Sequence, residues 1–283
     1  MSLLISVALA IILVFGLGHF APYLPYNELL DGNFYQIAGI VLAIVISAVL
    51  NMPMFYMLRA NSTYKKGKYK EGLALYKKAY KTKRISVDME IFCGYIFLKE
   101  GEKEFAGEVF EKLSSKEDKM TPRQKNNFET NKAILIWKNG DVNGAVELLE
   151  KVWERENSVT VAGTLGALML IAARQSGDYS GALEFCEETN EQYTYEKTIL
   201  ANLVEAYYCT NQNEKAIETF RELLDCGCSS PSPYYYGALA LLKAGEKDEA
   251  EEMLNKALRL RFSHVATITK KSVKEKLAEI TAE

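Results

Sequence analysis

Histidine and cysteine are the side chains of this sequence best suited to catalysis or metal binding. The chain has two histidines, His19 and His264, and neither has a serine or cysteine nucleophile and a carboxylate at a spacing that suggests a catalytic triad. The sequence also contains no glycine-rich phosphate-binding loop and no zinc-protease motif. We therefore predict a protein that is not an enzyme, with no catalytic residues and no cofactor.

The cysteine pattern favours a reducing compartment and no metal site. The five cysteines are Cys93, Cys186, Cys209, Cys226 and Cys228. An odd number is typical of cytoplasmic proteins, in which disulfides are rare. Cys226 and Cys228 flank one glycine and could ligate a metal or respond to oxidation, but a second pair and a nearby histidine are missing. We interpret this pair as part of an interhelix loop, and Cys186 as a core residue.

A pattern of glycine, small and large residues recurs six times along the chain. The thirteen-residue copies begin at Gly67, Gly101, Gly140, Gly177, Asn211 and Gly245, at intervals of 34, 39, 37, 34 and 34 residues. Five residues after each start stands a small residue: Gly72, Ala106, Ala145, Ala182, Ala216 or Ala250. Four residues further on stands a larger one: Tyr76, Phe110, Leu149, Cys186, Phe220 or Leu254.

This pattern resembles the tetratricopeptide repeat family, whose unit is two antiparallel helices in 34 residues. The resemblance covers residues 53–262 and implies that the five glycines end the first helix of each repeat with a left-handed cap. Asn211 departs from the pattern by replacing a turn glycine, and insertions are expected near residues 114–121 and 157–159.

Helix start signals in residues 59–283 agree with this resemblance. Thr121 before Pro122, and either Ser230 before Pro231 or Ser232 before Pro233, are typical of helix starts. No segment alternates with the period of a strand. We predict an all-α fold: an α-solenoid of about six helix-turn-helix repeats over residues 59–262, followed by a C-terminal capping helix within residues 263–283.

The first 58 residues predict a membrane anchor. They contain no lysine or arginine, and only Glu28 and Asp31 are acidic. Residues 2–20 and 37–58 are apolar and long enough to cross a bilayer, so we predict a two-helix transmembrane hairpin. A cleaved signal peptide is the alternative for the first stretch, but no basic residue precedes Arg59. A buried core helix is the alternative for the second, and its 22 uncharged residues oppose that interpretation.

The charges that flank the second stretch predict the orientation of the chain. Residues 59–84 carry ten lysines and arginines against Glu71 alone, while the loop between the apolar stretches carries no positive charge. The positive-inside rule therefore predicts that both termini and the solenoid lie in the cytoplasm. The compact layout of the chain favours a bacterial inner (plasma) membrane for the anchor. The basic residues could also contact anionic headgroups of the lipid bilayer. The opposite topology, an extracytoplasmic solenoid, is disfavoured by the same charges.

Two features concern the second apolar stretch. Gly39, Ala43 and Ser47 share one helix face and would allow close transmembrane packing, against either the first stretch or a second copy of the chain. The first helix of the first repeat, expected at residues 53–66, overlaps this stretch. Either one helix serves both segments or the first repeat is half present, and either arrangement would couple the solenoid rigidly to the bilayer.

The family resemblance implies a groove on the concave face, lined by the first helix of each repeat. Projecting the repeat register selects Tyr95, Trp137, Arg174, Glu205, Tyr208 and Tyr235 as groove residues. Aromatic and arginine side chains are typical anchors of interfaces, although burial between repeats is the alternative for each aromatic.

These features predict a non-catalytic, membrane-anchored scaffold that binds a protein or peptide partner at the cytoplasmic face. The alternative is a structural membrane organiser that acts through its transmembrane helices and lipid contacts, with an idle groove. Residues 59–283 are nearly neutral, with 34 basic and 35 acidic residues, which argues against a nucleic-acid partner. We also expect no small-molecule substrate.

Overall fold

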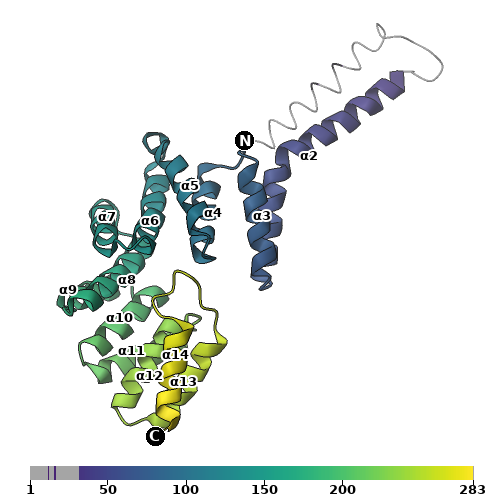
Figure 1. Cartoon of the computed structure of the whole chain (residues 1–283). Helices are drawn as coiled ribbons and strands as arrows, with labels where there is room; N and C mark the ends of the chain where they lie inside the picture. The colour runs from purple at the N-terminus through teal and green to yellow at the C-terminus, as the bar shows by residue number, and fades with distance from the viewer. Residues whose placement is uncertain (1–11, 13–15, 17–31, 283) are drawn as a thin grey trace. The chain divides into compact units, whose positions relative to one another are not determined.

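The computed structural model describes residues 12, 16 and 32–282. These residues form thirteen α-helices and one short 3-10 helix, and residues 32–282 contain no strand (Figure 1). The predicted all-helical class is therefore confirmed for the described part of the chain. The first predicted membrane stretch, residues 2–20, lies outside the described residues apart from Ile12 and Gly16, so the transmembrane hairpin stays a prediction.

The helices alternate between the first and second member of each repeat. The first helices are α2 (Gly32–Lys65), α4 (Val87–Lys99), α6 (Pro122–Lys138), α8 (Val159–Ser176), α10 (Lys197–Cys209) and α12 (Pro231–Lys243). The second helices are α3 (Tyr69–Lys81), α5 (Lys103–Ser114), α7 (Val142–Arg155), α9 (Ser180–Gln192), α11 (Asn213–Asp225) and α13 (Lys247–Arg259). The chain ends with α14 (Lys270–Ala282) and divides into two compact units, Met1–Cys93 and Gly94–Glu283.

In the first unit, α2 is one continuous helix of 34 residues that includes the second apolar stretch and the first helix of the first repeat. The structure thus supports the single-helix alternative rather than a half repeat. The C-terminal part of α2 packs against α3, where Tyr64 contacts the rings of Tyr69 and Tyr76 at centroid distances of 4.9 and 6.0 Å. A β-carbon at Gly72 would lie 3.1 Å from Cβ of Tyr64, which explains the small residue at this position.

The apolar half of α2 exposes most of its large side chains. Those exposed between residues 37 and 58 are Ile37, Ile40, Val41, Leu42, Ile44, Val45, Val49, Met52, Met54, Phe55 and Leu58. On the same helix Gly39 and Ala43 are buried and Ser47 is half-buried. Transmembrane packing by this predicted face stays a prediction.

Two described helical segments are long and apolar enough to cross a bilayer, namely Ile37–Lys65 of α2 and Val159–Ser176, which is α8. They differ in their surroundings. Helix α8 buries eight residues in the repeats, among them Leu165 and Leu168, and is a core helix. Length and composition therefore support an anchor at α2 only as a prediction.

The helix pairs of the second unit are packed at the small and large positions of the repeat. All the small residues, Ala106, Ala145, Ala182, Ala216 and Ala250, are at most 5% exposed. The larger residues Phe110, Leu149, Cys186, Phe220 and Leu254 are at most 2% exposed. The predicted register is therefore confirmed, as is the placement of Cys186 in the core. Trp153 packs edge-on against Phe185 at a centroid distance of 5.6 Å.

The turns within the repeats require a left-handed backbone. The five predicted glycines have φ values from +79° to +103°. Asn211 takes the same role with φ of +60°, and its side-chain oxygen accepts a hydrogen bond from Nζ of Lys243 at 2.8 Å. Asparagine is among the few residues other than glycine that adopt this conformation readily, which explains how the repeat tolerates the replacement.

The predicted helix starts and irregular segments are also seen. Thr121 caps α6 with a reciprocal capping box to Gln124, and Ser230 precedes α12 with Pro231 at its first turn. The first insertion contains the 3-10 helix Glu117–Lys119. At the C-terminus, Val273 and Ile280 of α14 are buried in the cluster that contains Met253 and Leu254 of α13, so α14 covers the last repeat.

Candidate functional site

A polar cluster joins the first helices of three successive repeats. Arg174 near the end of α8, Glu205 on α10 and Tyr236 on α12 meet at one point. Nη2 of Arg174 donates to Oε1 of Glu205 at 2.6 Å and to the hydroxyl oxygen of Tyr236 at 2.6 Å. Sequence reasoning placed Arg174 and Glu205 in the groove, and the structure brings them together. The name Arg174 cluster is used below for these three residues.

Burial controls the electrostatics of the Arg174 cluster. Glu205 is 4% exposed, and its burial raises the pKa of the carboxyl group, while the guanidinium of Arg174 opposes that change. Burial also raises the pKa of Tyr236, so the phenol stays protonated. The guanidinium therefore compensates a buried carboxylate that would otherwise be costly.

The other edge of the guanidinium is available to the chain. The side chain of Arg174 is 40% exposed, and Nη1 donates to the main-chain carbonyl oxygen of Thr267 at 3.3 Å. Thr267 lies in the non-helical segment that precedes α14. The cluster thus presents a fixed donor that already holds a main-chain carbonyl group of a non-helical segment.

Tyr208 and Tyr235, two further predicted groove residues, lie beside this cluster. Their ring centroids are 5.8 and 5.3 Å from that of Tyr236. Nζ of Lys243 lies 4.8 Å from the centre of the Tyr208 ring. Both tyrosines are half-buried and pack against the hydrophobic cluster that includes α14, so they form an aromatic wall next to Arg174.

Tyr95 and Trp137 are not part of this arrangement. Tyr95 on α4 is half-buried, and burial raises its pKa. Trp137 on α6 packs against the hydrophobic cluster around Leu149 and Leu165, with Nζ of Lys138 at 3.6 Å from its ring centre. For Trp137 the alternative of burial between repeats therefore describes its surroundings better than a free groove position.

Tyr236 was missed by the sequence analysis, which selected its neighbour Tyr235. Three tyrosines follow one another at positions 234–236, and one residue along a helix rotates the side chain by about 100°. Tyr234 packs on Phe220, Tyr235 faces the α14 side, and Tyr236 points to Glu205. A buried carboxylate at Glu205 needs a hydrogen-bond donor nearby, and this need would have pointed to a tyrosine such as Tyr236. The burial of Glu205 is known only from the structure.

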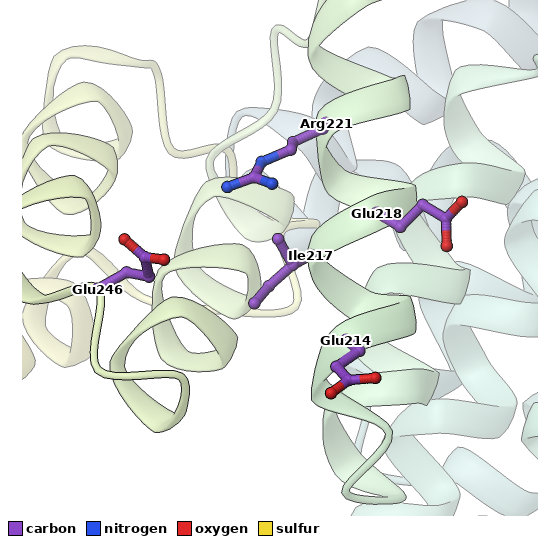
Figure 2. A pocket seen from close by; sticks show the side chains of 5 residues that line it. All are labelled: Glu214, Ile217, Glu218, Arg221 and Glu246. Carbon is purple, nitrogen blue, oxygen red and sulfur yellow. The ribbon is translucent and has the colours of Figure 1, made fainter.

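A pocket lies on α11, apart from the Arg174 cluster, and is less suited to binding. It is lined by Glu214, Ile217, Glu218 and Arg221 of α11 and by Glu246 (Figure 2). Figure 2 shows that the side chains of Glu218 and Arg221 point in opposite directions, so they do not converge on one point. Arg221 pairs with Glu249 at 3.4 Å. We therefore do not assign a ligand to this pocket.

The cysteine pair lies where the interhelix-loop interpretation placed it. Cys226 and Cys228 are half-buried between α11 and α12, on either side of Gly227 with φ of +86°. Burial raises the pKa of Cys228, which makes its thiol less reactive at neutral pH. The described residues contain no group of three histidine, cysteine or acidic side chains arranged to hold a metal ion.

Comparison with solved structures identifies the fold. A tetratricopeptide repeat protein from Parabacteroides merdae ATCC 43184 superposes with a TM-score of 0.61, at 13% identity, over 97% of this chain and 99% of that chain. The chain has the tetratricopeptide repeat fold. PilF of Pseudomonas aeruginosa is also similar, with a TM-score of 0.51 and 15% identity over 80% of this chain and 97% of that chain.

Sequence comparison adds a partial relative. No protein-family model matches the chain. The transcription activator GutR of Bacillus subtilis (strain 168) is 32% identical over 162 residues, which is 54% of this chain and 20% of GutR. The matched part covers about a fifth of that relative's length, so the similarity extends to a part of GutR and not to the whole protein.

Proposed function

We propose that the protein is a non-catalytic, membrane-anchored scaffold whose repeat groove binds a protein or peptide partner. The observation that carries the proposal is the hydrogen bond from Arg174 to the main-chain carbonyl oxygen of Thr267. A guanidinium has several donors in a rigid fork, so one edge can stay on Glu205 while the other holds a peptide carbonyl. Every peptide offers such carbonyl groups, and neighbouring Tyr208 and Tyr235 supply aromatic contact area.

The surface of α2 supports the membrane anchor. Eleven large apolar side chains are exposed between residues 37 and 58. Contiguous apolar surface of this kind marks contact with a membrane or another protein, and a stretch of 22 residues is long enough to span the hydrocarbon core. The lysines and arginines that follow support the proposal that the repeats lie in the cytoplasm, and we propose the inner membrane of a bacterium as the location.

Cysteine labelling in intact cells tests this topology. In a chain in which Cys209, Cys226 and Cys228 are replaced by serine, a single cysteine is introduced as Glu191→Cys at the exposed end of α9 or as Asn27→Cys in the predicted outer loop. A membrane-impermeant maleimide is expected to label Asn27→Cys in intact cells and Glu191→Cys only after lysis. Labelling of Glu191→Cys in intact cells would reverse the proposed orientation.

Partner capture tests the scaffold. Tagged full-length protein is purified from crosslinked native membranes, beside a Tyr208→Ala/Tyr235→Ala variant, and the bound proteins are identified by mass spectrometry. Loss of two aromatic anchors is expected to reduce recovery of the partner at least about ten-fold, as for a change of roughly 1.4 kcal/mol in binding. Tyr195→Asn is the control, since Tyr195 is 65% exposed and its φ of +65° suits asparagine.

The outcome also decides between the scaffold and the membrane-organiser alternative. Both variants must keep the helical content of the wild type by circular dichroism. Equal recovery from all three proteins would exclude the groove as the binding surface. Recovery that instead disappears on Gly39→Leu and Ala43→Leu would favour action through the transmembrane helices.

A further inference from the structure

The ten residues between α13 and α14, residues 260–269, reach far from the helices that they connect. This segment, called the strap below, is the yellow loop that extends away from α13 and α14 in Figure 1. Helix α14 packs directly on α13. Connections between neighbouring antiparallel helices are typically about 2–8 residues long, so a shorter turn would be enough.

The first half of the strap binds the turn between α4 and α5. Arg261 forms an ion pair with Glu100, which lies 161 residues earlier in the chain. The side chain of Glu100 is only 11% exposed. The backbone N–H of His264 donates to the carbonyl oxygen of Lys99 at 3.1 Å. The imidazole ring of His264 lies over Gly101, where a β-carbon would be 2.7 Å from the ring atom Cε1. A glycine is therefore needed at Gly101 for the ring to fit, as well as for the turn.

The second half of the strap binds the Arg174 cluster and α12. The carbonyl oxygen of Thr267 accepts the hydrogen bond from Arg174, and its hydroxyl lies 2.9 Å from that of Ser232. Ile268 is 7% exposed and belongs to the same hydrophobic cluster as Tyr236. The strap is thus held at three positions, Arg261, His264 and Thr267, which lie three residues apart. The first two contact the turn between α4 and α5, and the third contacts α8 and α12.

These contacts are those expected of a bound peptide. They combine a charge pair, a main-chain hydrogen bond at each of two positions, a ring seated on a glycine and a buried aliphatic side chain. We propose that the strap is a built-in ligand of the repeat groove, and that the partner is a segment of the same chemistry that replaces it. This partner carries a basic residue for Glu100, a planar ring three residues later for Gly101, and an aliphatic residue four positions after the ring. The inference rests on the proposed scaffold function and adds its regulation.

Covalent attachment gives the strap an advantage over a free partner. A segment tethered by a short linker competes at an effective concentration of the order of millimolar. The groove is therefore closed to a weak ligand until the strap is released. The apparent affinity for any partner is the affinity of the open chain multiplied by the fraction of chains that are open. Release of the strap is expected to raise partner affinity without any new contact.

A charge-swap experiment tests the proposal on the purified full-length chain. The probes are two fluorescent peptides of residues 259–270, one with the natural sequence and one with Glu at the position of Arg261. Arg261→Glu opens the strap by repulsion from Glu100 and is expected to bind the natural peptide at least about ten-fold more tightly than the wild type does. Glu100→Arg is expected to open the strap too, but to bind only the peptide with Glu. The double variant Glu100→Arg/Arg261→Glu closes again and binds neither peptide tightly.

His264→Ala provides a second way to open the strap, without a change of charge at Arg261. Circular dichroism must show wild-type helical content for each variant. If the folded open variants bind neither peptide, or if the wild type binds the natural peptide as tightly as they do, the built-in ligand is excluded. If the open variants bind both peptides equally tightly, the Glu100 contact is excluded, and with it the proposed chemistry of the partner.

Partner capture with the same variants separates this inference from the proposed function. A groove-dependent partner recovered equally from wild type and Arg261→Glu would support the scaffold and overturn the strap as its competitor. Peptide exchange as expected, with no partner recovered from any variant, would overturn the scaffold and leave the strap as an intramolecular ligand.

Discussion

Arg174→Met is expected to lower the free energy of unfolding of the full-length chain by about 3 kcal/mol at pH 7. The substitution removes the guanidinium that compensates Glu205, whose carboxylate is 4% exposed and bonded to Tyr236. A buried charge left without its partner is among the most destabilising changes in a protein. The value is taken at the low end for buried pairs because Arg174 itself is 40% exposed. Urea unfolding in detergent, followed by circular dichroism, measures it.

The pH dependence identifies the cause of this loss. Burial raises the pKa of Glu205 above its unfolded value, and loss of Arg174 would raise it further. A raised carboxyl pKa means that the folded state binds the proton more tightly than the unfolded state does. The stability is therefore greatest below the unfolded pKa and falls as the pH rises from the unfolded pKa through the folded pKa. The deficit of Arg174→Met should therefore shrink between pH 7 and about pH 4.5.

Two further variants control this prediction. Adding Glu205→Gln to Arg174→Met removes the uncompensated charge and should recover most of the loss. Arg221→Met breaks an exposed ion pair with Glu249 and should change stability by no more than about 1 kcal/mol. A deficit for Arg174→Met that is equal at both pH values would contradict the electrostatic explanation.

The repeat architecture could be predicted from the sequence because its signals are local. Each repeat carries a left-handed turn, a small residue five positions later and a large residue after that. These three signals act within a single helix pair, and six imperfect copies together determine the register. Asn211 shows the strength of this logic, since it was recognised as a substitute for glycine and has φ of +60°. The overlap of two predicted segments left two arrangements open at α2, and the structure has the continuous helix.

The site was predictable only in part, because its contacts join distant repeats. Projection of the repeat register selected Arg174 and Glu205 on successive first helices, and the structure pairs them. The contact of Arg261 with Glu100 is different, since it crosses 161 residues and depends on the curvature of the whole unit. That curvature is the sum of small rotations at every repeat, and two repeats carry insertions. No local pattern marks residues 260–269 as a ligand.

Phe220→Ala is expected to lower the free energy of unfolding by about 3–5 kcal/mol. Phe220 is 1% exposed at the large position of its repeat and packs edge-on against Tyr234 at a centroid distance of 5.7 Å. Its ring also fills the space beside Gly237 on α12, where an added β-carbon would overlap the ring atoms. Truncation therefore removes buried apolar area and leaves a cavity between α11 and α12.

The close fit of this ring to Gly237 gives a sharper test than truncation alone. Gly237→Ala should lower stability by about 1–3 kcal/mol, because the ring must move. In the background of Phe220→Leu the same change should be much less harmful, since the smaller side chain leaves room, and a double-mutant cycle in urea measures the difference. Gly181→Ala is the matched control: Gly181 is also helical but has open space around it, so it should gain up to about 1 kcal/mol. Additive effects of Phe220→Leu and Gly237→Ala would show that the ring does not occupy the place of the missing β-carbon.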